Sequence, residues 1–275
     1  MKSNQLKVAA VQMVSFKGDF LKNRTTIKSY IEQASAQKVE MLITPELSNV
    51  GYDLSILNNL KYNFQDEVSY YSNLARQYGI TLALGLLEIE GTDLYNSLVV
   101  IDTAGNIQSK YRKNNLFPLG KEDKVFKKGT LPAWFNHGDF KIGLSICYDI
   151  RFPELYRAYL ENDCNVIVVS SAFPFPRLEH WTTLLKAHAI MNQAYVIASN
   201  RIGIDGKLQF LGNSCIIDPW GEVISSFSDK EEGILTGFIE LPRIDEVRNK
   251  IPAFSDRKKI ASVKYSLSDP VRNFN

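Results

Sequence analysis

Short apolar segments recur along the whole chain, and several of them are continuously hydrophobic rather than alternating with polar residues. Continuous hydrophobicity over about four to eight residues is typical of strands that are covered on both faces. We therefore predict buried β-strands in these segments. They include Lys7–Met13, Met41–Thr44, Thr81–Leu87, Ser97–Asp102, Lys141–Cys147, Asn165–Ser171, Tyr195–Ser199, Ser214–Ile217 and Ile234–Ile239.

Helical periodicity occurs between some of these strands. Ile27, Ile31 and Ala34 follow an i, i+4, i+7 spacing, which places them on one face of a helix. Pro153 opens another segment, and proline suits the first turn of a helix because an N–H there would lack a helical partner anyway. The spacing predicts helices over Asn23–Gln37, Asp66–Tyr78, Pro153–Leu160 and Trp181–Gln193.

The order of these elements indicates an α/β fold. Helices occur early, in the middle and late, and strands separate them, often two in succession. Such an order is typical of helices packed over the faces of sheets. The pattern does not distinguish one sheet from two. No linker rich in proline, glycine or serine divides the chain, so we expect a single domain over residues 1–275.

The charge balance argues against polyanionic partners. The 275 residues carry 32 basic and 30 acidic side chains, a formal net charge of +2. This gives no electrostatic reason to expect binding to nucleic acid or to an anionic membrane surface. No apolar run approaches the roughly 18 residues that span a bilayer. The first residues lead into a strand-like segment without the apolar core of a signal peptide, so we expect a cytoplasmic protein.

The cysteines are few, odd in number and far apart, at Cys147, Cys164 and Cys215. This pattern argues against a disulfide framework and lacks the Cys-x-x-Cys spacing of metal sites. It fits a reducing compartment, and we expect neither a metal nor another cofactor. Cys164 and Cys215 border apolar runs, and we interpret them as buried small hydrophobic residues.

Two charged residues lie at positions that suit a functional site. One follows a predicted strand, and the other precedes a pair of apolar residues. Glu46 comes directly after the strand Met41–Thr44 and Pro45, and parallel α/β sheets bind ligands beyond the carboxyl ends of their strands. Lys113 ends the basic run Lys110–Lys113, shortly before an apolar pair. Each segment by itself also fits a non-catalytic interpretation. Glu46 would then be a surface glutamate at a helix start, and Lys113 would belong to a solvated basic loop.

The strongest signal is Cys147, because a buried strand delivers it to a turn and a helix beginning at Pro153 follows. Backbone N–H groups near a helix start favour a thiolate and donate to an oxyanion. Polar and charged residues crowd the turn after this cysteine. Amide cleavage needs a nucleophile, a base, an acid for the leaving nitrogen and a cradle for the oxyanion. Cys147, Glu46 and Lys113 fill these roles without a histidine.

The segments around these three residues resemble the motifs of the nitrilase superfamily, the carbon–nitrogen hydrolases. The order and spacing agree, and the similarity continues to about Tyr265, so nearly the whole chain is covered. Asn115 stands where many relatives carry histidine, at a position with no assigned catalytic step. The Glu, Lys and Cys motifs are matched in turn by Pro45-Glu46-Leu47, by Tyr111-Arg112-Lys113, and by Ile146-Cys147-Tyr148-Asp149 with Arg151-Phe152-Pro153-Glu154.

The resemblance implies a four-layer α-β-β-α sandwich and a homodimer that pairs through helices near the nucleophile. The C-terminal tail, about residues 243–275, is expected to pack on the partner subunit. The implied mechanism has Glu46 deprotonate Cys147, whose thiolate attacks the amide carbonyl. Lys113 and the Tyr148 N–H hold the oxyanion. Water then hydrolyses the thioester, activated by Glu46 with help from Glu122, the family's second acidic residue.

The substrate class follows from further similarity to the ω-amidase branch and its relatives that act on deaminated glutathione. The similar segments are Ser171–Trp181, Asn200–Gly203 and Val247–Phe254. These enzymes hydrolyse the terminal amide of α-keto acid amides such as α-ketoglutaramate, so a small anionic amide is the expected partner and a plain nitrile is disfavoured. The residues expected to meet this substrate are Arg151, Arg177 and Arg201 at its carboxylate and Phe173 at the border of the site.

Several alternatives remain open. Within the hydrolases they are a deaminated-glutathione amidase, an N-carbamoyl amidase or another small-amide hydrolase. An acyl transferase would pass the same acyl group to an amine, and a non-catalytic scaffold would usually have lost a member of the triad that is complete here. A Cys–His hydrolase would need a histidine beside Cys147. His180 and His188 lie two turns apart on a predicted helix, too far for a simple paired metal site.

Overall fold

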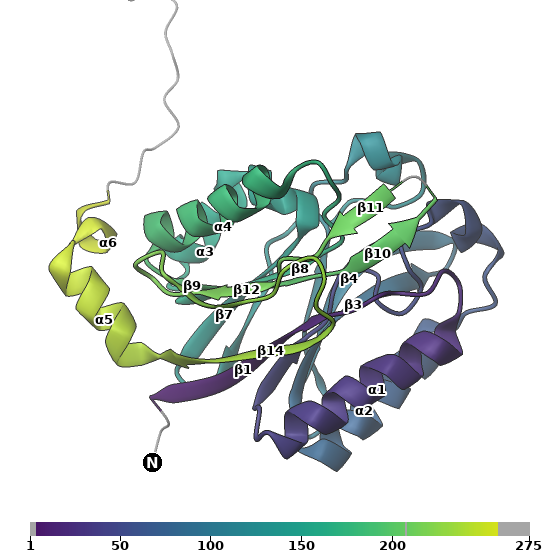
Figure 1. The fold of residues 1–275 in the computed structure, drawn as a ribbon, viewed down its shortest axis with the longest axis horizontal. Coiled ribbons are helices and arrows are strands. Elements are labelled where there is room, and N and C mark those ends of the chain that lie inside the picture. Colours follow the sequence, from purple (N-terminus) through teal and green to yellow (C-terminus); the bar gives the residue numbers. More distant parts are fainter. Residues whose placement is uncertain (1–3, 207, 258–275) are drawn as a thin grey trace, which may run out of the picture.

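Two six-stranded sheets pack face to face between two pairs of helices, and this arrangement gives four layers (Figure 1). The computed structural model describes residues 4–206 and 208–257. Within these residues no helix is both long enough and apolar enough to cross a membrane. The expected α-β-β-α sandwich is confirmed, and the number of sheets, which the hydrophobic pattern left open, is settled by the strand pairing.

The first sheet has the strand order β14-β1-β2-β3-β4-β5. Its central pairs, β1 with β2 and β2 with β3, are parallel, whereas the other pairs are antiparallel. The strands in chain order are β1 (Gln5–Gln12), β2 (Met41–Ile43), β3 (Thr81–Glu90), β4 (Asp93–Ile101), β5 (Ile107–Arg112) and β14 (Gly233–Glu240).

The second sheet has the order β13-β12-β9-β8-β7-β6, with β7, β8 and β9 mutually parallel. A separate two-stranded hairpin, β10 (Ile202–Asp205) with β11 (Leu208–Leu211), lies beyond the ends of the central strands (Figure 1). The strands of the sheet are β6 (Trp134–His137), β7 (Phe140–Ile146), β8 (Val166–Ser171), β9 (Tyr195–Asn200), β12 (Cys215–Ile217) and β13 (Val223–Ser226).

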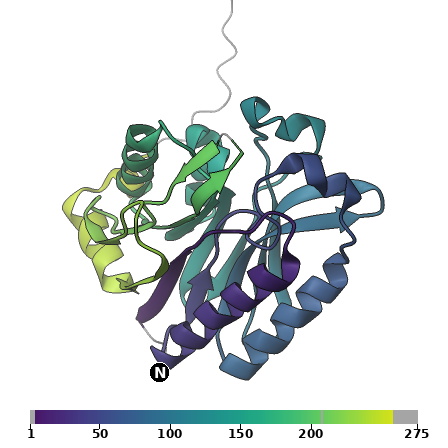
Figure 2. The ribbon, with the colours of Figure 1, turned by 45° about the vertical axis from the view of Figure 1, so that its right-hand side comes forward.

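Helices α1 (Phe20–Ala36) and α2 (Phe64–Tyr78) cover the outer face of the first sheet, and α3 (Pro153–Glu161) and α4 (Leu178–Asn192) cover that of the second (Figure 2). The stripe of Ile27, Ile31 and Ala34 is fully buried and packs in one cluster with outward-facing residues of the first sheet. All four predicted helices and all of the predicted strands are therefore confirmed, with ends that differ by a few residues.

The inner faces of the two sheets share the other large hydrophobic cluster. Val8 and Ile43 of the first sheet belong to it together with Ile142 and Ile146 of β7. Because helices cover the outer faces as well, the central strands are buried on both sides, which explains their continuous hydrophobicity.

The two sheets are also joined by hydrogen bonds from serine side chains. Ser170 Oγ at the end of β8 donates to Thr44 O after β2 at 2.9 Å, and Ser199 Oγ donates to Val11 O. The carboxyl ends of strands from both sheets therefore meet at one edge of the sandwich.

The C-terminal part turns away from the sandwich. Helices α5 (Leu241–Lys250) and α6 (Ala253–Asp256) follow β14, and Gln193 anchors them by donating to Ile251 O and accepting from the Phe254 N–H. The expected tail of residues 243–275 thus begins inside α5. Residues 258–275 lie outside the described part of the chain, and the packing of this tail on a partner stays a prediction.

Gly85 of β3 lies directly against the segment that carries Glu46. A Cβ atom at this position would lie 2.2 Å from Pro45 O and 2.9 Å from Glu46 Cα. Gly85→Ala should therefore lower the free energy of unfolding by at least about 2 kcal/mol, because an overpacked core must shift its backbone. Equilibrium denaturation in urea measures this loss.

Gly91→Ala is the control, because Gly91 has a left-handed φ of 62° but no atom within 4 Å of its added Cβ. It should lower the free energy of unfolding by about 1 kcal/mol through backbone strain alone. A Gly85→Ala protein as stable as wild type would contradict the packing described here.

Candidate active site

Three chemically reactive side chains from three different strands meet at this edge of the sandwich. Glu46 follows β2, Lys113 follows β5 directly, and Cys147 follows β7 directly. Their exposed fractions are 0%, 1% and 5%, so all three are essentially cut off from solvent. The structure thus brings together the three residues that the sequence nominated.

The Glu46 carboxylate is buried with several donors around it. Its Oε1 accepts from Lys113 Nζ at 2.6 Å and from Asn96 Nδ2 at 2.6 Å, and its Oε2 accepts from the Ala172 N–H at 2.8 Å. Burying a carboxylate is costly unless its oxygens are hydrogen-bonded. These three donors come from β4, from the segment after β5 and from the segment after β8, so both sheets hold Glu46.

Lys113 also contacts a second carboxylate, Glu122, at 2.8 Å. Burial by itself would lower the pKa of Lys113, but Glu122 and Glu46 outweigh it and raise that pKa well above its usual value. Lys113 is therefore a fixed ammonium at neutral pH. Two carboxylates and one ammonium give the cluster one net negative charge when both acids are ionised.

Glu122 lies in a short 3-10 helix, Glu122–Lys124, and is fully buried. Its Oε1 accepts from Lys113 and from the Tyr52 hydroxyl, and its Oε2 accepts from the Phe117 N–H at 2.8 Å. Burial raises the pKa of Glu122, and the donors Lys113 and Tyr52 oppose that increase.

Cys147 begins the 3-10 helix Cys147–Arg151 with a φ of 47°, in the left-handed region that non-glycine residues rarely adopt. Such strained conformations are common at functional turns. Burial, followed by the nearby negative charge of Glu46, raises the pKa of the Cys147 thiol well above its usual value, while Lys113 opposes the increase. The thiol is therefore protonated at rest and needs a base to become a nucleophile.

Asp149 ties the Cys147 turn to the segment that carries Lys113. Its buried carboxylate accepts from the Ile146 N–H and the Tyr111 hydroxyl, each at 2.9 Å. It also accepts from both the backbone N–H and the side-chain amide of Asn115, at 3.0 and 2.9 Å. Asn115, the departure from many relatives, thus has a structural role as a double donor to Asp149.

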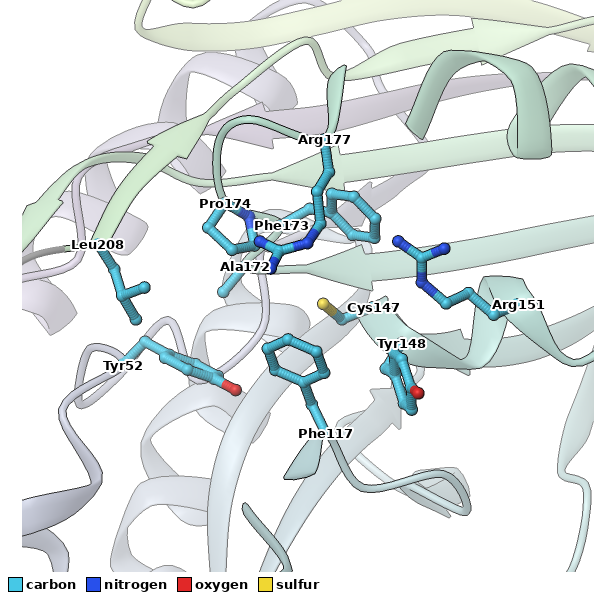
Figure 3. A pocket seen from close by; sticks show the side chains of 10 residues that line it. All are labelled: Tyr52, Phe117, Cys147, Tyr148, Arg151, Ala172, Phe173, Pro174, Arg177 and Leu208. Atoms are coloured by element: carbon cyan, nitrogen blue, oxygen red, sulfur yellow. The ribbon is translucent and has the colours of Figure 1, made fainter. Parts of the chain in front are cut away.

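A pocket opens over Cys147 (Figure 3) and holds about 350 Å³ of space between its lining side chains, adjoining solvent included. Arg151 and Arg177 reach toward the space above the thiol, and Phe117 and Tyr148 lie on the opposite side (Figure 3). The lining residues are Tyr52, Phe117, Cys147, Tyr148, Arg151, Ala172, Phe173, Pro174, Arg177 and Leu208.

Both arginines of the pocket lack an acidic partner within residues 4–206 and 208–257. Arg151 donates toward His180 Nδ1 at 3.0 Å and lies 5.6 Å from the Phe173 ring. Arg177 lies 5.7 Å from the Phe117 ring. Two guanidinium groups without a carboxylate, beside an otherwise apolar pocket, form a suitable site for an anionic ligand.

Arg201 lies elsewhere, and the structure does not bring it into this pocket. Its side chain is completely buried, forms an ion pair with Asp205 and donates to Ser15 O at 3.0 Å. The guanidinium also stacks 4.2 Å from the Phe210 ring. Its charge is thus already satisfied inside the protein.

The two histidines considered for a Cys–His pair have other partners. His188 Nε2 contacts Ile150 O at 2.8 Å, and its ring stacks on Tyr156 at 3.6 Å. His180 contacts Arg151 at the pocket. Glu46 and Lys113, rather than a histidine, therefore surround the thiol.

A protein-family model described as carbon-nitrogen hydrolase matches residues 7–249 of the chain. This match covers most of the 275 residues. The chain therefore belongs to the carbon–nitrogen hydrolases, and the resemblance seen in its three motifs is confirmed.

Within this family, the chain is similar to proteins that are named as amidases. The chain is 38% identical over 232 residues to a 2-oxoglutaramate amidase of Bacillus subtilis, covering 84% of this chain and 89% of that protein. It is 34% identical over 276 residues to a deaminated glutathione amidase of Dictyostelium discoideum, covering 93% and 95% of the two chains.

Solved structures share the fold. A mutant amidase from Nesterenkonia sp. matches with a TM-score of 0.83 and 25% identity, over 92% of this chain and 94% of that chain. In that structure the acetamide moiety of fluoroacetamide is covalently added at the active-site cysteine.

Sequence reasoning missed several residues that complete the site. Tyr52, Asn96 and the Ala172 N–H bond the two glutamates, and Asp149 organises the turn. Tyr52 and Asn96 carry no periodic or strand-end signal. Asp149 stood inside the Cys motif, and its position two residues after the nucleophile was the available hint.

Asp149→Asn should lower the free energy of unfolding by about 1–3 kcal/mol, because the new amide places N–H groups against donors and leaves buried groups unpaired. Asn115→Ala removes only the side-chain donor and should cost about 1 kcal/mol. Denaturant titration of both variants checks the order. A more damaging Asn115→Ala than Asp149→Asn would contradict the role assigned to Asp149.

Proposed function

We propose that this protein is a cysteine-dependent amidase that hydrolyses the terminal amide of a small linear substrate through a thioester at Cys147. The observation that carries the proposal is the Lys113 ammonium shared by two buried carboxylates next to a buried, protonated thiol. This arrangement supplies a nucleophile, a base and a fixed positive charge in one solvent-excluded place.

In the acylation step, Glu46 accepts the proton of the Cys147 thiol, and the thiolate sulfur bonds to the amide carbonyl carbon. Negative charge develops on the carbonyl oxygen, where Lys113 and the Tyr148 N–H stabilise it. Glu46 then returns the proton to the amide nitrogen, the C–N bond breaks, and ammonia leaves. The product on the enzyme is a thioester.

In the deacylation step, water loses a proton to Glu46 and bonds to the thioester carbonyl carbon. Lys113 and Tyr148 stabilise the second oxyanion in the same way. The C–S bond breaks, the proton returns to the Cys147 sulfur, and the carboxylic acid is released. The balance is one amide and one water consumed, with one acid and one ammonia formed.

Glu122 remains on Lys113 throughout both steps. When Glu46 is protonated it loses its charge, and Glu122 is then the carboxylate that keeps the ammonium in place at 2.8 Å. Glu122 thus supports the reaction by holding Lys113 in place. Because Lys113 also contacts Glu46, this helps Glu46 to activate water.

For the substrate we infer an α-keto acid amide such as α-ketoglutaramate, which is the 2-oxoglutaramate named for the Bacillus subtilis relative. Such a molecule carries a carboxylate, and Arg151 and Arg177 of the pocket are cations without an acidic partner in the described part of the chain. Deaminated glutathione, named for the Dictyostelium discoideum relative, is the second candidate because the same keto-acid group forms its amide. That amide joins the keto acid to cysteinylglycine, so the amine of cysteinylglycine would leave in place of ammonia.

We further propose that the chain works as a homodimer, as its family resemblance implies, and in the cytoplasm, a reducing compartment that fits its few and scattered cysteines. Sedimentation velocity of the purified protein tests this oligomeric state. A monomer at micromolar concentration would contradict the proposed dimer.

Hydrolysis of a panel of small amides tests the reaction, measured as released ammonia or, for deaminated glutathione, as released cysteinylglycine. Cys147→Ala should abolish release, and Glu46→Gln and Lys113→Ala should each lower kcat by about 10²–10⁴-fold, because each removes one catalytic function. Cys164→Ala, another buried cysteine, is the control and should keep wild-type activity. The panel contains α-ketoglutaramate, α-ketosuccinamate, deaminated glutathione, a carbamoyl amine and a simple nitrile. Full activity in any of the three site variants would contradict the catalytic role assigned to that residue.

Arg151→Met and Arg177→Met test recognition of the carboxylate. Each should raise KM for α-ketoglutaramate by about 10–100-fold, the usual value of a hydrogen bond to a charged group. A neutral amide of equal length should be hydrolysed unchanged by both variants. Arg157→Met, at an exposed position of α3, is the matched control. An equal loss on the charged and neutral amides would contradict the assignment.

A further inference from the structure

Tyr52 joins the pocket to the buried charge cluster. Its ring lines the pocket over Cys147 (Figure 3), and its hydroxyl donates to Glu122 Oε1. The side chain lies in the segment after Glu46 and is 6% exposed. The steps of hydrolysis described above make no use of this hydroxyl.

Three hydrogen-bond donors stabilise the ionised form of the Glu122 carboxylate. Glu122 accepts from Lys113, from the Phe117 N–H and from Tyr52. Burial raises the pKa of Glu122, followed in size by Lys113, which lowers it, and by the repulsion of Glu46, which raises it. The charged or titratable groups that face Glu122 are therefore Lys113, Glu46 and Tyr52, with the Cys147 thiol near the same ammonium.

A protonated Glu122 would disable the oxyanion site. During turnover Glu46 takes up a proton, and Lys113 then relies on Glu122 as its charged partner. If Glu122 were also neutral, the buried ammonium would have no counter-charge, and a buried unpaired cation tends to lose its proton. The Tyr52 hydroxyl and the Phe117 N–H both oppose this without adding a charge, and of the two the hydroxyl is the side-chain donor.

A buried network fixes the position of Tyr52. Its N–H donates to Asp205 Oδ2 at 3.1 Å, and its ring meets the edge of Phe210 at 5.9 Å. Asp205 is paired with Arg201, which is itself held by Ser15 O and stacked on Phe210. Arg201, expected from the sequence to bind substrate, is thus placed to hold the anchor of Tyr52.

Resting on the proposed function, we propose that Tyr52 is a positioning residue of the hydrolysis. Its hydroxyl keeps Glu122 ionised, and Glu122 keeps the Lys113 ammonium at the oxyanion while Glu46 carries the proton. The Arg201–Asp205 pair holds Tyr52 in the place where it does this.

The experiment compares pH profiles of ammonia release for wild type, Tyr52→Phe and Tyr62→Phe. Removal of the Tyr52 hydroxyl should lower kcat by about tenfold, leave KM within about twofold, and move the acidic limb upward by roughly one pH unit. The sign follows because losing a donor raises the pKa of Glu122, so protonation begins at higher pH. Tyr62→Phe, which loses a hydroxyl donor to Leu87 O, should leave the limb in place.

A second variant guards against misfolding of Tyr52→Phe. Incorporation of 3-fluorotyrosine in place of Tyr52 keeps the shape of the ring and makes the hydroxyl a stronger donor. It should move the acidic limb in the opposite direction, to lower pH. An acidic limb at the wild-type pH in both Tyr52 variants would overturn the proposal, as would a loss confined to KM.

Alkylation of Cys147 by iodoacetamide, followed by mass spectrometry of its peptide, gives a pH profile that needs no turnover. In Tyr52→Phe the limb of this profile should move downward, because Glu122 is more easily neutralised and no longer raises the pKa of the Cys147 thiol. If wild type hydrolysed no amide of the panel, the proposed function would fail. The alkylation limb would still show whether the Tyr52 hydroxyl controls the charge of Glu122, and a limb at the wild-type pH in Tyr52→Phe would overturn that control.

Discussion

The Lys113 ammonium lies between the Glu46 and Glu122 carboxylates, at 2.6 and 2.8 Å, with all three side chains removed from water. Desolvation of three charges costs several kcal/mol for each ion unless every group is well paired. The surrounding structure supplies that pairing through Asn96, the Ala172 N–H, Tyr52 and the Phe117 N–H. These donors come from separate parts of the chain, so the cluster can form only when both sheets and their connecting segments are in place.

The same constraint explains how the thiol can react. A buried thiol next to a net negative cluster is poorly ionised at rest, as the raised pKa of Cys147 indicates. In the proposed reaction Glu46 takes the proton of the thiol. The total charge of the cluster then stays constant, and ionisation of the thiol becomes favourable. The left-handed turn at Cys147 and the Asp149 carboxylate hold the sulfur at the pocket while this transfer occurs. Low solvent access thus protects the nucleophile and strengthens the field of Lys113.

The sequence predicted the central strands, the four main helices and the grouping of Glu46, Lys113 and Cys147, because each has a local signal or lies in a family motif. Strand β5 (Ile107–Arg112) was missed because it is a mostly polar edge strand without an apolar run. The partners of the triad were missed because the contacts span large separations, 70 residues for Tyr52 with Glu122 and 50 for Asn96 with Glu46. Arg201 was placed in the pocket because sequence does not reveal burial, although its ion-pair partner stands four residues away.

The central claim is that Cys147 carries the acyl group during turnover. Rapid-quench mass spectrometry of the wild-type protein mixed with α-ketoglutaramate tests it directly, after digestion into peptides. The peptide that contains Cys147 should gain the mass of the acyl group within one turnover and lose it when substrate is exhausted, with Cys164 and Cys215 peptides unchanged. Steady ammonia release without an adduct on Cys147, or an adduct on either other cysteine, would contradict the account.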